Sequence, residues 1–116
     1  MNFDEEVVSA IFKELFEDNS ERYKKSLTKP VDNGNDVYAK ARNALSKLSD
    51  SEKNDILNFI DVVIADSASI IFGALDGSYF PCDLDGDFIV TYKDDEIQGS
   101  LQDIFIEKAE GKGIYG

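Results

Sequence analysis

The sequence predicts one α+β domain, with N-terminal helices packed on a small antiparallel sheet and a C-terminal helix that closes the fold. Apolar residues recur at helical spacing as far as Gly77. The segment 88–92 is instead rich in β-branched and aromatic residues, as strands are, and a helical pattern returns after Ser100. With 116 residues, of which 42% are hydrophobic, the chain has the size and composition of a single domain, residues 1–116.

The first helix is expected to begin at Asn2, which can cap it together with Glu5 three residues later. It should end at the polar segment 18–20. Its apolar side chains recur at helical spacing and are Val7, Val8, Ile11, Phe12, Leu15 and Phe16. A short polar helix over 21–27 and a turn after Pro30 follow.

Two longer helices are expected before Gly77. The first covers about 36–48, and its apolar stripe consists of Val37, Ala41, Ala44, Leu45 and Leu48. Ser49 and Glu52 form a capping box for the second, which should end at Gly73 or Gly77. Because this second helix is apolar around most of its circumference, we expect it to be the central helix, with other elements packed on two sides.

The sheet is expected to consist of a strand over 88–92, a polar loop over 93–96 and a short strand over 97–99. Ser100 can cap the last helix, and Gly111 is a natural residue to end it. The buried residues of this helix should be Leu101, Ile104, Phe105 and Ala109.

Negative charge is concentrated in the second half of the chain. Residues 1–58 hold twelve acids and nine bases, a net charge of −3, whereas residues 59–116 hold twelve acids and three bases, a net charge of −9. Acidic surfaces keep proteins in solution, but solubility does not require the acids to lie in one half. Such a field repels nucleic acids and anionic membranes and attracts basic proteins, so the expected partner is a basic protein.

The sequence contains no histidine, which removes the commonest general base and most zinc and copper sites. We therefore expect no enzymatic activity, no metal and no cofactor. The single cysteine, Cys82, is flanked by acids that raise the pKa of a thiol, and we expect a half-buried structural side chain.

A cytoplasmic location is expected, because the first residues are acidic where a secretory signal would be basic. The lone cysteine also fits a reducing compartment. The most apolar stretch, 59–75, is interrupted by Asp61 and Asp66, which favours a buried helix over a membrane span.

The run from Asp83 to Asp87 resembles two known motifs, and neither is complete. An EF-hand loop needs a glycine after its third acid and a glutamate at position twelve, but Gly86 precedes Asp87 and Asp94 occupies the twelfth place. The segment also matches the D-x-D-G of haloacid-dehalogenase-like phosphatases over four residues. Only thirty residues follow Gly86, too few for the rest of that fold. A tight acidic turn is the expected structure.

Six acids are expected on neighbouring loops of the small sheet: Asp83, Asp85, Asp87, Asp94, Asp95 and Glu96. They could simply discourage edge-to-edge aggregation of the sheet. They could equally form an acidic surface for Lys and Arg side chains of a partner. In that case Tyr79 and Tyr92 would be the aromatic anchors of the interface.

The segment 59–77, followed by 88–90 and 100–103, resembles in layout the C-terminal helix–sheet–helix region of small bacterial immunity proteins. These are encoded beside secreted polymorphic toxins, including those of contact-dependent growth inhibition systems. The resemblance covers about half of the chain and implies a cytoplasmic protein that neutralises a cognate toxin, often a nuclease.

Two alternatives share the small size and the acidity. One is a phage-encoded inhibitor that mimics DNA and blocks a host defence nuclease. The other is a general protein-interaction adaptor. An acidic inhibitor fits the composition because nucleases bind phosphates through Lys and Arg side chains, for which carboxylates compete.

Overall fold

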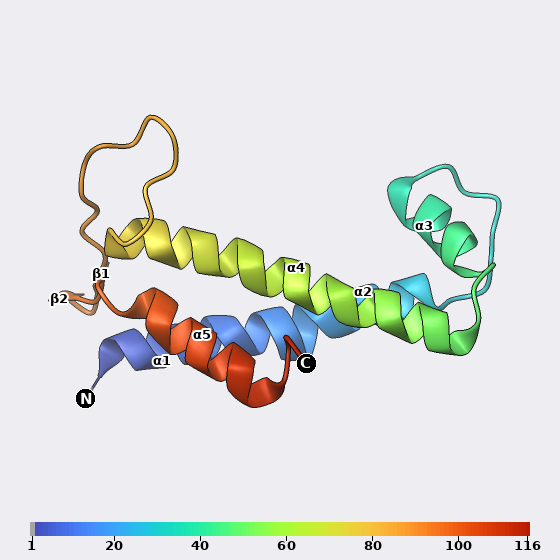
Figure 1. Cartoon of the computed structure of the whole chain (residues 1–116), viewed down its shortest axis with the longest axis horizontal. Helices are drawn as coiled ribbons and strands as arrows, with labels where there is room; N and C mark the ends of the chain where they lie inside the picture. The colour runs from blue at the N-terminus through green and yellow to red at the C-terminus, as the bar shows by residue number, and fades with distance from the viewer. Residues whose placement is uncertain (1) are drawn as a thin grey trace.

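The computed structural model describes residues 2–116 and shows a mostly helical molecule with one small antiparallel sheet (Figure 1). In chain order the elements are α1 (Phe3–Lys13), the π-helix η1 (Glu14–Asn19), α2 (Ser20–Leu27), α3 (Val37–Leu45), α4 (Asp50–Asp76), β1 (Thr91–Tyr92), β2 (Asp95–Glu96) and α5 (Leu101–Lys112). The molecule is elongated, with extents of 49 × 32 × 25 Å, and α4 follows its long axis. It is therefore α+β in a loose sense.

The N-terminal third is one continuous helical rod formed by α1, η1 and α2. The predicted break at 18–20 was wrong, because the chain passes through a π-helical segment there instead of a loop. The predicted Asn2 cap also does not form: Asp4 accepts the backbone N–H of Glu5 at 2.7 Å instead. Ser20, at the start of α2, is buried and donates a short hydrogen bond to Asp61 of α4.

The predicted capping box of α4 is confirmed. Ser49 Oγ accepts the N–H of Glu52 at 3.2 Å, and Glu52 Oε1 accepts the N–H of Ser49 at 3.0 Å. Of the two candidate glycines, Gly77 ends the helix, with a left-handed φ of 78°. Gly73 lies inside the helix and is buried against Gln102 of α5.

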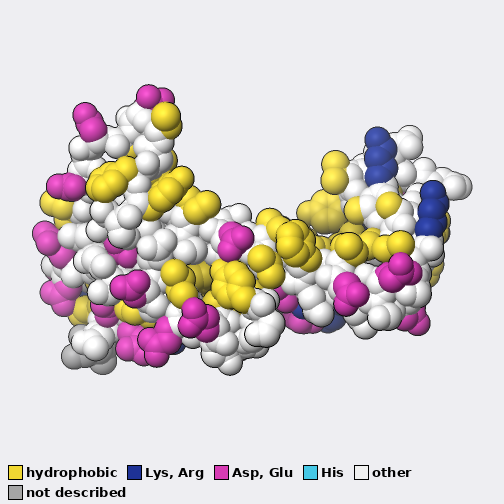
Figure 2. Space-filling model, viewed as in Figure 1, with side chains coloured by type: hydrophobic (Ala, Val, Ile, Leu, Met, Phe, Trp, Pro, Cys, Tyr) yellow, Lys and Arg dark blue, Asp and Glu magenta, His cyan; other side chains and the backbone are white. Residues whose placement is uncertain are grey.

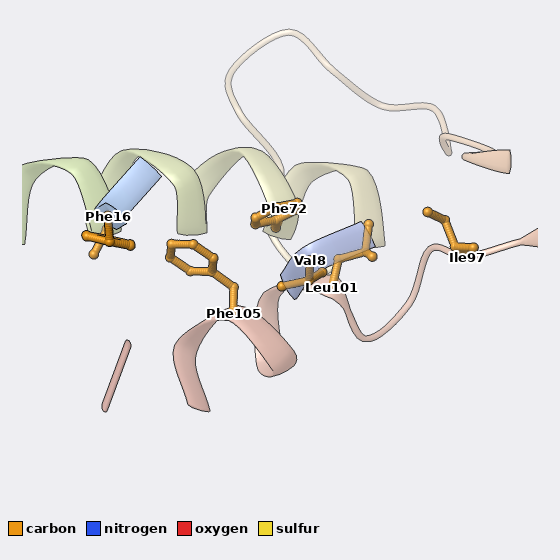
Figure 3. Packing of buried hydrophobic residues seen from close by; sticks show 7 residues of the cluster. Val8, Phe16, Phe72, Ile97, Leu101 and Phe105 are labelled. Atoms are coloured by element: carbon orange, nitrogen blue, oxygen red, sulfur yellow. The ribbon is translucent and has the colours of Figure 1, made fainter. Parts of the chain in front are cut away.

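The core lies between helices at one end of α4, which differs from the prediction that helices pack on the sheet. Its buried residues are Val8, Phe16, Ala65, Phe72, Ile97, Leu101 and Phe105 (Figure 3). The Phe105 ring contacts those of Phe12, Phe16 and Phe72 at centroid distances of 5.3–6.2 Å. A sheet with two residues in each strand is too small to cover this cluster, so α1, η1, α4 and α5 cover it for one another.

The prediction that α4 is enclosed on two sides was wrong. In its most apolar stretch of 18 residues, only 22% are buried. Because α5 and the rod of α1, η1 and α2 cover one side of α4, the opposite side remains exposed. The exposed apolar side chains of this helix are Ile56, Phe59, Val63, Ile70 and Ile71.

The α3 segment stands at the far end of α4, and a buried arginine attaches it. Asp36 caps α3 by accepting the N–H of Ala39 at 2.9 Å. Arg42 donates to Ser26 O at 2.8 Å and to Asp32 Oδ2 at 2.6 Å. The predicted apolar stripe was wrong, because Val37 is 80% exposed whereas Ala39 and Arg42 are buried.

In the last helix, α5, the predicted residues Leu101, Phe105 and Ala109 are buried and Ile104 is partly buried, but both ends of the helix differ from the prediction. Ser100 does not cap it. Asp76, at the end of α4, instead accepts the N–H groups of Gly99, Leu101 and Gln102 at 2.6–3.1 Å. The helix continues through Gly111 and ends at Gly113, whose φ is 77°.

Candidate functional site

The acids predicted at 94–96 lie on a tight β-hairpin. Thr91 pairs with Glu96 and Tyr92 with Asp95, and the turn residues Lys93 and Asp94 have φ values of 51° and 67°. Two consecutive positive φ values are the signature of the type I′ turn that suits two-residue hairpins. The prediction placed strands at 88–92 and 97–99; the ladder continues only to a bond from Ile97 N–H to Val90 O at 2.8 Å. The hairpin holds its three carboxylates exposed.

A polar cleft of about 370 Å³ joins the hairpin to the first turn of α1. Asp4, Asp95 and Glu96 contribute to its lining. The exposed Glu5 and Glu6 extend the acids around α1. We call the six residues Asp4, Glu5, Glu6, Asp94, Asp95 and Glu96 the acidic end. The sequence analysis used Glu5 only as part of a helix cap and missed the proximity of the three α1 acids to the hairpin, because about ninety residues separate the two groups.

Tyr92 joins the acidic end to the core. Its ring meets that of Phe3 edge-on at a centroid distance of 5.7 Å, and Lys93 Nζ lies 5.3 Å from the Tyr92 ring and 5.5 Å from the Phe3 ring. The Tyr92 side chain is half-buried, so most of its contacts are already made within the chain. Tyr79 is 46% exposed and lies at the start of the long loop after α4.

The acids Asp83, Asp85 and Asp87 are exposed on this long loop, residues 77–90, which arches away from the end of α4 (Figure 1). This loop rises away from the hairpin, so the six acids predicted from the sequence form two groups, one on the loop and one on the hairpin. Asp83 adopts a left-handed φ of 74° in the turn. Cys82 is exposed, which corrects the expectation of a half-buried thiol.

In the part of the chain that the structure describes, the Lys and Arg side chains make no ion pair with the acidic end. Among the ion pairs of residues 2–116, none involves any of its six carboxylates. The shortest pairs lie elsewhere, between Arg42 and Asp32 at 2.6 Å and between Lys24 and Asp61 at 2.9 Å. Asp61 of α4 is part-buried, and its ion pair with Lys24 anchors α2 on α4.

The exposed side of α4 is the second feature that stands out. A mostly apolar groove of about 460 Å³ runs between α4 and the rod of α1, η1 and α2, and Val63 and Ile71 line it. Within residues 2–116, α4 is the one helix that has the length and composition of a membrane span, a property that the core helices of soluble proteins share. Figure 2 shows hydrophobic side chains along the upper edge of the molecule, which is hollowed between two raised ends.

Across the described residues 2–116, no group of three or more His, Cys, Asp or Glu side chains could hold a metal ion. Two surfaces stand out among these residues, the acidic end and the exposed apolar side of α4. In comparisons with known proteins, no family model, no curated protein and no solved structure matches the chain.

Proposed function

We propose that the chain is a binding protein that neutralises a basic protein partner, a bacterial toxin domain of the nuclease type, in the cytoplasm. The observation that carries this proposal is the acidic end, where three carboxylates line a polar cleft and three more lie beside it, and where no ion pair forms within residues 2–116. Nucleases bind the phosphates of their substrates with Lys and Arg side chains. Carboxylates on a rigid hairpin can form ion pairs with those Lys and Arg side chains and so prevent the substrate from binding.

The hairpin supports this role because its backbone is held before any partner arrives. A type I′ turn and a cross-strand ladder fix Asp94, Asp95 and Glu96, so little conformational entropy is lost when they bind. The Tyr92–Phe3 contact anchors the hairpin on α1. Long-range attraction by the net charge of −12 would speed the encounter with a basic partner.

The test uses the product of the gene next to the one that encodes this chain, purified as a catalytically impaired variant. Surface plasmon resonance at two salt concentrations compares the wild type with the triple variant Asp94→Asn, Asp95→Asn and Glu96→Gln. Asn tolerates the left-handed conformation at position 94, so the turn should be kept. We expect affinity at low salt to fall by about ten-fold or more and the salt dependence to become shallower.

The matched control neutralises three acids on η1, Glu14, Glu17 and Asp18, which lie outside the acidic end. Equal affinity for the wild type, the triple variant and the control would reject the acidic end as the interface. Loss of affinity in the control alone would place the interface on η1. A nuclease assay with the active neighbour product then shows whether binding inhibits it.

A further inference from the structure

We propose that the exposed side of α4 is a docking surface for one amphipathic helix of a partner protein, which runs antiparallel to α4. The first observation is the spacing of its side chains. Positions alternate by four and three residues along the helix, which is the repeat of a coiled-coil seam. The residues at these positions are Ile56, Ile60, Val63, Ser67, Ile70 and Ala74.

Three members of this seam are β-branched and at least 46% exposed, namely Ile56, Val63 and Ile70. Phe59 beside them is 62% exposed. The opposite side of the same helix carries Ala65 and Phe72, which are buried in the core. The seam therefore does not contribute to the core of this chain. Contiguous exposed apolar surface of this kind marks interaction sites.

The shape of the surface selects a single helix as its occupant. The loop 77–90 and the α3 segment rise at the two ends of α4 and leave a hollow between them (Figure 2). The exposed side of α4 is the floor of this hollow. From Ile56 to Ala74 the floor is about 27 Å long at 1.5 Å per residue, which matches a helix of about five turns. A second copy aligned with this one would meet it first at the raised ends, and so would a flat bilayer.

Charge at the two ends of the hollow selects the direction of that helix. The loop 77–90 carries three aspartates and no basic residue. At the other end, residues 29–47 hold four basic residues and two acids, a net charge of +2, and Lys29, Lys40 and Lys47 are exposed. Figure 2 shows acidic side chains on one raised end and basic ones on the other. Because a helix is positive at its N-terminus and negative at its C-terminus, the occupant should place its N-terminus beside the loop. It then runs antiparallel to α4.

This surface stands apart from the proposed function, since none of the six residues of the acidic end lies on the floor of the hollow. The two can therefore fail separately. A partner that is bound at the acidic end could still contribute the docking helix.

The probe is a synthetic 18-residue peptide, acetylated, amidated and labelled with fluorescein. It carries leucine at heptad positions a and d, lysine at the remaining positions of its first half and glutamate at those of its second half. A second peptide has the two charged halves exchanged. Fluorescence anisotropy with the full chain should show saturable micromolar binding of the first peptide and at least about five-fold weaker binding of the second.

Val63→Glu and Phe59→Ser test the floor, since both side chains are at least half exposed and their loss should leave the fold intact. Each should weaken binding by about ten-fold or more, as loss of a central anchor does. Ala10→Glu adds the same charge on exposed α1 and should bind as the wild type does.

Three results would overturn the proposal. One is that the first peptide does not bind, or that Val63→Glu leaves its affinity unchanged. Another is a wild-type dimer in sedimentation velocity that Val63→Glu converts to a monomer, since a second copy would then cover α4. The third is flotation of the wild type, but not of Val63→Glu, with phosphatidylcholine–phosphatidylglycerol vesicles.

Discussion

Gly73 shows how a single missing side chain sets the distance between α4 and α5. A Cβ at this position would lie 2.6 Å from Gln102 Nε2 and 3.2 Å from Tyr79 Cβ. Gln102 is itself engaged, since its side-chain amide donates to Ser69 O at 3.0 Å and accepts from Ser78 Oγ at 3.2 Å. The two helices pack closely because position 73 has no side chain.

Gly73→Ala should therefore destabilise the protein, although alanine is normally the better helix former. Overpacking costs about 1–3 kcal/mol, and the gain in helix propensity is about 1 kcal/mol. Gly111→Ala is the matched control, because nothing lies within 4 Å of its added Cβ and α5 continues through it. We expect urea unfolding to show a net loss for the first variant and a gain of up to about 1 kcal/mol for the second. A stabilised Gly73→Ala would show that the helices can separate without loss.

Tyr115 gives a prediction about pH. Burial raises the pKa of its phenol above 10.0, and the hydrogen bond to Asp66 Oδ1 at 3.1 Å adds to the shift because ionisation would break it beside a carboxylate. With the folded pKa above the unfolded one, the stabilisation is complete below pH 10 and is lost as the pH rises through the folded value. Denaturant midpoints measured from pH 8 to 11 should decline less in Tyr115→Phe than in the wild type. Equal declines would contradict the contact.

Among the elements, the junction of α4 with α5 depends on one carboxylate that serves both helices. Asp76 is the last residue of α4, and its two oxygens accept three N–H groups at the start of α5. These are donors that a helix cannot satisfy internally, and a negative charge is favourable beside them. The cap on α5 thus comes from another helix 25 residues earlier in the chain.

Asp76→Ala should cost about 1–3 kcal/mol, since three donors lose their charged acceptor. Ser100→Ala should cost less than about 0.5 kcal/mol, because the Ser100 side chain does not cap α5 in this structure. Thermal unfolding followed by circular dichroism distinguishes the two. The reverse order of stability would show that Ser100 is the cap in solution.

The starts of α4 and α5 show why one helix cap could be predicted from the sequence and the other could not. The capping box at Ser49 and Glu52 joins residues three apart, so its pattern is visible in the chain and the prediction was confirmed. The cap of α5 joins Asp76 to residues 99–102, and a local pattern that ends in Ser100 gives no sign of it. The same limit applies to the candidate site. The hairpin acids could be read from 94–96, whereas the nearby acids of α1 could not.

At the scale of the whole molecule, the core is displaced to one end of a long helix. Apolar residues occur around most of α4, and this pattern predicted burial on two sides. The pattern shows which faces of the helix are apolar, but it does not show whether the chain supplies elements to cover them. The chain supplies α5 and the N-terminal rod for one side and nothing of comparable length for the other. The sequence therefore indicated the right helix and could not distinguish an apolar face that is buried in the core from one that stays exposed.

Phe105→Ala and Phe59→Ala test this placement of the core. Phe105 is fully buried among three other rings, and its truncation should cost about 3–5 kcal/mol. Phe59 is 62% exposed, and its truncation should stay within about 0.5 kcal/mol. Urea unfolding at one protein concentration measures both. A large loss at Phe59 would mean that α4 is covered on both sides in solution.

The π-helical segment η1 fixes the rotational phase of the N-terminal rod. A π turn takes in about one residue more than an α turn. If the same residues from Phe3 onward formed a regular α-helix without this extra residue in the turn, every later side chain would be turned by about 100° around the axis. Ser20 and Lys24 would then point away from Asp61, to which both now donate. The irregular turn is thus what lets one rod face α5 with its first half and α4 with its second, and a change of η1 to regular α-helix at constant length would detach one of them.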